Sequence, residues 1–183
     1  MSKRTISPVD LFEHLKTVYP SDVKEMHLKR DETLLNAGQK ENYIYFVKKG
    51  ALRVIYSENE REQNVRFGYE GSILTSLPAF FSSAPSLFTI RTIRKSVLDF
   101  CPKTIFLQEI EENETLKGSY LLILEELIAQ LVERELDLLE SSPKERYKRL
   151  QERSPTVFQE IPAKHIANYL RMTPEHFSRL QKS

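Results

Sequence analysis

The sequence predicts an α+β protein with an antiparallel β domain, a long helix and a small helical domain at its C-terminus. Three observations lead to this expectation. Between Met26 and Cys101, short runs rich in β-branched and aromatic residues recur about every ten residues, with turn residues between them. From Glu109 to Glu140 there is no proline, and apolar residues recur at helical spacing. Beyond that stretch, short amphipathic segments start at prolines.

The composition is that of a soluble globular protein. The chain has 183 residues, of which 40% are hydrophobic and 29% charged. Its single cysteine, Cys101, excludes an internal disulfide, an iron–sulfur cluster and a cysteine-rich zinc site. No apolar run reaches the roughly 18 residues of a membrane span, and the first residues lack the apolar core of a secretory signal. We therefore expect a cytoplasmic protein that does not contact a membrane.

The charge is distributed unevenly along the chain. The net charge is +1, yet residues 141–183 hold nine basic and four acidic residues, so that this part carries +5 and the rest −4. A basic module on an acidic body is the usual electrostatic pattern of a polyanion binder. The alternative is a solvated basic helix pair.

The β domain is expected to follow a first helix over 9–18. The runs 43–47 and 51–56 flank Lys48-Lys49-Gly50 and predict a hairpin in which Gly50 takes a positive φ. Residues 57–63 are expected to form a charged connection. Further strands are predicted in NVRFGY, LFTIRTI and SVLDFC, which makes an antiparallel barrel or sandwich.

The helix predicted over 109–140 has two apolar stripes, which indicates two partners. At 1.5 Å per residue it would be about 45 Å long, more than one small domain can cover. A helix buried within a monomer is the alternative to a dimer interface. The stripe assigned to the dimer is Leu121, Leu124, Ile128, Leu131 and Leu138, and the adjacent stripe is Leu116, Tyr120, Ile123 and Leu127.

The C-terminal part is predicted to contain a helix-turn-helix. Ser142 and Pro143 have the positions of an N-cap and a first helical residue. VFQEI is expected to be extended. A helix starting at Pro162 and a second one, with Thr173 as N-cap and Pro174 next to it, are joined by the turn RMT. The interlocking apolar residues would be Ala167, Leu170, Met172 and Phe177.

The second helix of this pair is expected to expose Glu175, His176, Arg179 and Lys182. Arginine can donate two hydrogen bonds to guanine and glutamate can accept one from cytosine, in a major groove that admits a helix. A solvated helix face is the alternative interpretation.

The chain resembles the Crp/Fnr superfamily of bacterial transcription regulators. The tail SPKERYKRLQERSPTVFQEIPAKHIANYLRMTPEHFSRLQK is similar to the DNA-binding domain of that family, closest to the variant without a glycine-led wing common in Bacteroidetes. The stretch ETLLNAGQKENYIYFVKKGALRVIY resembles its β-roll. The resemblance implies a jelly-roll-like, cyclic-nucleotide-binding-like sensor over 1–108, a dimerisation helix over 109–140 and a helix-turn-helix domain over 141–183.

This resemblance also implies partners and roles. The protein would be a homodimer that reads a palindromic DNA operator in major grooves about 34 Å apart and contacts RNA polymerase. Glu175 and Arg179 match base-reading positions, and His176 would assist them. Pro174 stands where the family usually has an arginine, and Arg171 where its turn usually has glycine. Phosphate contacts are expected from Lys164, Thr173 and Lys182.

The effector site departs from the family pattern. Cyclic-AMP-binding members use a Gly-Glu pair and, about ten residues later, an arginine followed by a small polar residue. Those places fall here on Thr75 and Ser76 and on Ser86 and Leu87, and no arginine lies between positions 66 and 91. A cyclic phosphate would lack its bidentate partner, so the sequence disfavours cyclic AMP and predicts no cofactor.

The sequence gives weaker evidence for other ligand-binding sites. His14 and His27 are expected to be surface residues rather than haem ligands. The phenylalanines Phe80, Phe81 and Phe88 either line an apolar pocket or pack in the core.

No hydrolase, nucleotide-binding or metalloprotease motif is present, so an enzyme is not expected. The alternative to a DNA-binding regulator is a small-ligand or cyclic-nucleotide-binding module that acts through protein partners.

Overall fold

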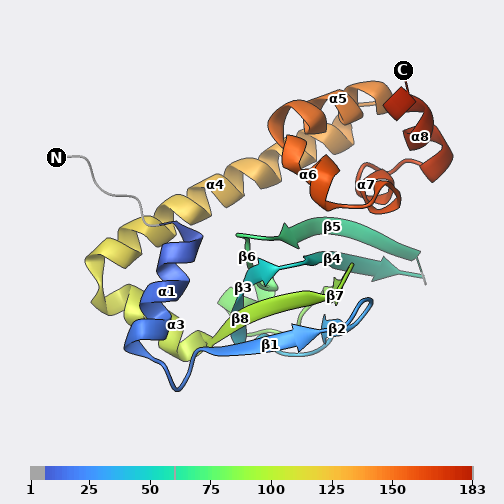
Figure 1. The fold of residues 1–183 in the computed structure, drawn as a ribbon. Coiled ribbons are helices and arrows are strands. Elements are labelled where there is room, and N and C mark those ends of the chain that lie inside the picture. The colour runs from blue at the N-terminus through green and yellow to red at the C-terminus, as the bar shows by residue number, and fades with distance from the viewer. Residues whose placement is uncertain (1–6, 60, 183) are drawn as a thin grey trace.

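The computed structural model describes residues 7–59 and 61–182. Two antiparallel sheets face each other, helices cover one end, and a long helix leads to a helical domain that lies over one sheet (Figure 1). The α+β fold class is thereby confirmed. One sheet has the order β1 (Lys24–Leu28), β8 (Ser96–Pro102), β3 (Tyr43–Lys49) and β6 (Ile73–Leu74). The other has the order β2 (Thr33–Leu35), β7 (Thr89–Thr92), β4 (Ala51–Glu58) and β5 (Arg61–Tyr69).

The helices are α1 (Pro8–Val18), α2 (Leu77–Ser82), α3 (Lys103–Glu112), α4 (Glu114–Leu139), α5 (Pro143–Arg153), α6 (Pro155–Glu160), α7 (Ala163–Tyr169) and α8 (Pro174–Lys182). Two of the helices, α2 and α6, lie where the sequence predicted none. The inner faces of the two sheets form one core that includes Leu52, Leu74 and Leu98. A second core joins α1, α3 and the start of α4 to the outer face of the first sheet.

The hairpin predicted around Gly50 is wrong. β3 pairs with β6 and β8, whereas β4 pairs with β5 and β7, so the chain crosses from one sheet to the other at this point. Gly50 does take a positive φ, +107°, and a Cβ on it would lie 2.6 Å from the Cα of Ser96. The glycine is therefore required by a close approach between two sheets and not by a two-stranded turn.

Of the residues expected to form a charged connection, 57–63, residues 57–58 and 61–63 lie in the paired ends of β4 and β5 instead. β4 and β5 pair from Ala51 opposite Tyr69 out to Glu58 opposite Arg61. Charged side chains are compatible with strands here because this end of the hairpin is exposed.

The long helix is shorter than predicted. α3 ends at Glu112, and α4 begins at Glu114 after a residue with extended backbone. Asn113 is that residue, and its side-chain oxygen accepts hydrogen bonds of 3.2 Å from the backbone nitrogens of Thr115 and Leu116. This N-cap fixes a new helix start in a stretch without proline.

The extended conformation predicted for VFQEI is also wrong, because α6 covers most of it. Ser154-Pro155 ends α5 and at the same time starts α6, with the proline in its first turn. Val157 and Ile161 lie four residues apart and are both buried in the helical domain. The helical spacing of these two residues was present in the sequence and decided the local structure.

The helical domain packs directly against the β domain. Its core contains Leu150, Ile166 and Phe177 and is completed by Ala51 and Ile93 from the sheet region. The C-terminal helices are consequently packed against the β domain and not tethered loosely to it.

Candidate nucleic-acid interface and ligand cavity

The helices α7 and α8 form the predicted helix-turn-helix. Ala167, Leu170 and Phe177 are fully buried between them and their neighbours. The Oγ1 atom of Thr173 accepts a hydrogen bond of 3.2 Å from the backbone N–H of His176, as an N-cap does. Arg171, in the turn, has φ +56°, a left-handed conformation that a side chain disfavours.

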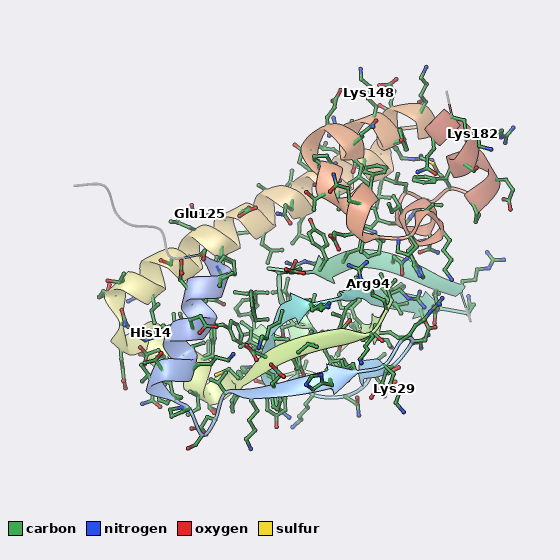
Figure 2. All side chains as sticks on the ribbon, in the orientation of Figure 1. His14, Lys29, Arg94, Glu125, Lys148 and Lys182 are labelled. Atoms are coloured by element: carbon green, nitrogen blue, oxygen red, sulfur yellow. The ribbon has the colours of Figure 1, made fainter. Side chains whose placement is uncertain are left out.

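The side chains predicted to contact DNA lie on the outside of this unit. Glu175 and Arg179 on α8 are exposed, and His176 is half-buried. Figure 2 shows Lys182 on the outer side of the helical domain, away from the sheets. Among the residues that the structure describes, no hydrogen bond or ion pair engages the side chains of Glu175, Arg179, Lys164 or Lys182. These side chains are free to bind a partner.

The first helix of the pair is bound to the edge strand β5. The Asn168 side chain accepts a hydrogen bond of 2.6 Å from the backbone nitrogen of Asn64 and donates one of 2.9 Å to the carbonyl of Glu62. In return, Asn64 Nδ2 donates to the carbonyl of His165 at 3.0 Å. A carboxamide thus occupies the place of a neighbouring strand at an otherwise unpaired edge.

α4 is apolar on two sides, as predicted. Leu116 and Leu127 are buried against the rest of the chain, and Tyr120 and Ile123 pack beside them. On the other side Leu121 is 52% exposed, Ile128 60% and Leu131 47%. Leu124 and Leu138 are half-buried. The first stripe therefore has its partner within the chain, while most of the second faces outwards.

A buried carboxylate joins α4 to the helical domain. Asp137, 1% exposed, forms ion pairs with Arg149, at 3.0 Å from its Nε, and with Arg153. Arg149 also reaches Glu133 at 2.7 Å. Sequence reasoning missed this cluster, although an aspartate one helical turn after a glutamate, followed by an arginine-rich helix, was a usable signal.

The four predicted effector positions do not stay together. Ser76 and Ser86 are buried and their hydroxyls lie 2.7 Å apart. Thr75, also buried, donates from its hydroxyl to the carbonyl of Tyr43 at 3.1 Å. Leu87, in contrast, is 64% exposed.

Glu41 is a buried carboxyl group beside these residues that the sequence did not reveal. It accepts hydrogen bonds from the backbone nitrogen of Ser76, at 3.2 Å, and from the hydroxyl of Tyr45, at 3.3 Å. Burial raises its pKa despite these hydrogen bonds. The backbone N–H ahead of α2 is thereby engaged by a carboxyl group of the protein itself.

A cavity of about 440 Å³ lies between β4, β5, α2 and α4. Val54, Val65, Phe88, Leu131 and Leu138 give it a largely apolar wall. Thr75 and Ser76 line one part, and the arginines Arg66 and Arg134 line another. Its volume falls within the range of small-molecule sites.

The remaining candidate residues are packed in the core, exposed or hydrogen-bonded within the protein. Phe80 is in the core, Phe81 is 56% exposed, and only Phe88 lines the cavity. Cys101 is buried, which raises the pKa of its thiol to about 12. His14 hydrogen-bonds Glu109 at 2.8 Å. Within the described ranges, no cluster of three or more metal-ligating side chains occurs.

Residues 25–113 match the family model of the cyclic nucleotide-binding domain. No curated protein sequence matches the chain. Over the part that the structure describes, no helix is long and apolar enough to cross a bilayer.

Solved structures share the fold over nearly the whole chain. A CooA mutant from Carboxydothermus hydrogenoformans has a TM-score of 0.73 at 15% identity, covering 94% of this chain and 82% of its own. A cyclic nucleotide-binding domain containing protein from Listeria monocytogenes has a TM-score of 0.73 at 19% identity, covering 96% and 89%. The c-di-GMP responsive global regulator CLP from Xanthomonas campestris has a TM-score of 0.66 at 14% identity, covering 96% and 89%. These likenesses confirm the predicted resemblance at the level of the fold.

Proposed function

We propose that this chain, which has the fold of solved Crp/Fnr regulators and matches the family model of the cyclic nucleotide-binding domain over residues 25–113, is a homodimeric transcription regulator that binds a palindromic DNA operator through α8. The observation that carries this proposal is a basic, N-capped helix whose charged side chains are exposed and unengaged within the described chain.

The assignment of roles follows exposure and chemistry. Arg179 would donate to a guanine edge and Glu175 would accept from a cytosine, with His176 beside them. Lys164 at the start of α7, Thr173 at the start of α8 and Lys182 at its end would bind phosphates and fix the register on the duplex.

Dimerisation would use the outward stripe of α4. Leu121, Ile128 and Leu131 are spaced by one or two helical turns and are about half exposed, a pattern typical of one helix of a coiled coil. Pairing of two such helices would place two copies of α8 on successive major grooves. Residues 1–108 would then act as sensor, and contact with RNA polymerase would be made by the bound dimer.

Regulation would pass through two rigid connections. The Asp137 ion pairs hold α5 to the end of α4, and the Asn168 hydrogen bonds hold α7 to β5. A change in the packing of α4 on the β domain would therefore alter the orientation of α8.

Selection of bound sequences from random DNA, followed by gel shifts at two salt concentrations, tests the proposal. A palindrome should be enriched, and affinity should fall as salt rises, because phosphate contacts release counterions. On the selected sequence, Arg179→Ala should cost about 1–3 kcal/mol and relax discrimination at one base pair.

Lys24→Ala is the control, because this exposed lysine at the start of β1 lies on the sheet remote from α8 and loses the same charge (Figure 1). Equal binding by Arg179→Ala and the unchanged protein would contradict the assignment of α8. If no palindrome is enriched and the affinity for DNA does not change with salt, the result would instead favour a ligand-binding module that acts through protein partners.

A further inference from the structure

Arg66 on β5 is a half-buried cation without a counterion among the described residues. It lines the 440 Å³ cavity and also a second, smaller cavity of about 280 Å³ between the β domain, α4 and the helical domain. The side chain is only partly exposed, and no described residue forms a hydrogen bond or ion pair with it. Burial lowers the pKa of its guanidinium. A half-buried charge without a counterion is costly unless an anion binds to it.

Arg134 on α4 adds a second positive charge to the same cavity. It donates one hydrogen bond of 3.3 Å to the carbonyl of Asn64 and lies over the ring of Tyr169, 5.0 Å from its centroid. Among the described residues, no carboxylate lies within ion-pair distance of it. Glu135 lines the cavity too, but it is exposed and pairs with neither arginine.

The opposite part of the cavity does not favour an anion. There the backbone N–H of Ser76 already donates to the buried carboxyl group of Glu41, and the hydroxyl groups of Thr75 and Ser76 are engaged with other residues. An anionic group in the cavity would therefore find the N–H of Ser76 already engaged and would be attracted to the arginine side.

Between these two parts the wall is apolar. Phe88 and Val65 come from the β domain, and Leu131 and Leu138 come from α4. Such a wall binds a hydrocarbon or aromatic body and offers few partners for the polar edges of a nucleobase or a ribose.

We propose that this cavity binds an amphipathic monoanion, whose carboxylate pairs with Arg66 and Arg134 and whose apolar body lies against Phe88, Leu131 and Leu138. The inference deepens the proposed function and rests on it, since a ligand held between the β domain and α4 would be the signal that the regulator senses. Leu131 lies both at the cavity and in the outward stripe of α4, so a bound ligand would touch the helix that is proposed to pair in the dimer.

The experiment is calorimetric titration of the full chain, without DNA, with decanoate as the probe. Binding is expected for decanoate, and it should be at least about tenfold weaker for decanol, which keeps the apolar body and lacks the charge. Arg66→Gln should weaken decanoate binding by roughly tenfold to a hundredfold and leave decanol binding unchanged.

Arg61→Gln is the matched control, because Arg61 lies on the same strand, is exposed and lines neither cavity. It should bind decanoate as the unchanged protein does. Equal binding of decanoate and decanol, unchanged decanoate binding by Arg66→Gln, or binding of cyclic AMP with no binding of decanoate would each overturn the proposal. DNA binding by α8 is measured separately, so failure of this inference leaves the operator test intact.

Discussion

The side-chain oxygen Oδ1 of Asn168 lies 2.6 Å from the backbone nitrogen of Asn64 and accepts its hydrogen bond. Asn168 belongs to the first helix of the helix-turn-helix, and Asn64 to the edge strand of the β domain. Since the same carboxamide also donates to Glu62 O at 2.9 Å, it binds the strand as another strand would. Asn168 is therefore one of the contacts that fix the orientation of the helical domain on the β domain, together with the packing of Ala51 and Ile93 in the core of that domain.

Replacing Asn168 by alanine is expected to loosen this docking. Two backbone groups of β5 would lose their partner, which costs about 1–3 kcal/mol for each group that stays buried and unsatisfied. Urea unfolding should show the loss, and hydrogen exchange should show faster exchange at the Asn64 amide. Asn36→Ala is the control, because the Asn36 side chain is exposed and makes no hydrogen bond within the described chain. Unchanged protection of that amide would contradict the role of Asn168.

Two glycine substitutions should have opposite effects. Gly50→Ala places a Cβ at φ +107° and within 2.6 Å of Ser96 Cα, so we expect a loss of more than about 2 kcal/mol in the free energy of unfolding. Gly118→Ala, in α4, meets nothing within 4 Å and should gain about 0.5–1 kcal/mol. Both are measured by urea unfolding at one pH. Similar effects of the two substitutions would show that the crossing at Gly50 tolerates a side chain.

His165 should make stability depend on pH. Burial lowers its pKa from 6.5 to about 4, and the positive charges of Arg53 and Lys164 add to the effect. Between these values the unfolded chain binds a proton that the folded chain does not, so the free energy of unfolding falls as pH falls from 6.5 towards 4. This contribution is absent in His165→Gln.

The measurement is urea unfolding of both proteins at several pH values over that interval. The difference in stability between His165→Gln and the unchanged protein should shift in favour of the variant as pH falls. Asn36→Gln, a substitution of an exposed side chain that makes no hydrogen bond within the described chain, should run parallel to the unchanged protein. A parallel curve for His165→Gln would mean that the imidazole is not held neutral by the fold.

Ile128→Glu should separate the proposed dimer. Ile128 is 60% exposed in the centre of the outward stripe of α4, so a charge there would be buried in the pair and leave the monomer fold intact. Sedimentation should show a monomer, and urea unfolding of that monomer should remain cooperative. Val18→Glu on α1, where the side chain is 47% exposed, should remain a dimer. A dimeric Ile128→Glu variant would place the interface elsewhere.

Much of the fold could be predicted from local patterns. Ser142-Pro143 and Thr173-Pro174 start helices where the sequence predicts them, because capping and the fixed φ of proline act over a few residues. The two stripes of α4 follow from helical periodicity alone. The fold class followed from the same signals together with the family resemblance.

The errors have two physical causes, long-range strand pairing and local capping. Tyr43–Lys49 and Ala51–Glu58 are correctly strands, but pairing decides that they belong to different sheets, and Gly50 is needed because Ser96, 46 positions further on, comes close to it. Asn113 interrupts a helix by capping, and Ser154-Pro155 starts one where a break was expected.

The features of the candidate DNA and ligand sites also divide into those set by local sequence and those set by tertiary contacts. The sequence by itself determined the helix-turn-helix, its basic charge and the apolar stripe left for a partner, since these depend on the order and spacing of neighbouring residues. Only the tertiary structure decided that Leu87 is exposed while Ser76 and Ser86 are buried. It also decided that Glu41 accepts a hydrogen bond from the N–H of Ser76 and that Arg66 and Arg134 line one cavity. These relationships join residues from separate strands and helices, and no local pattern specifies which of them meet.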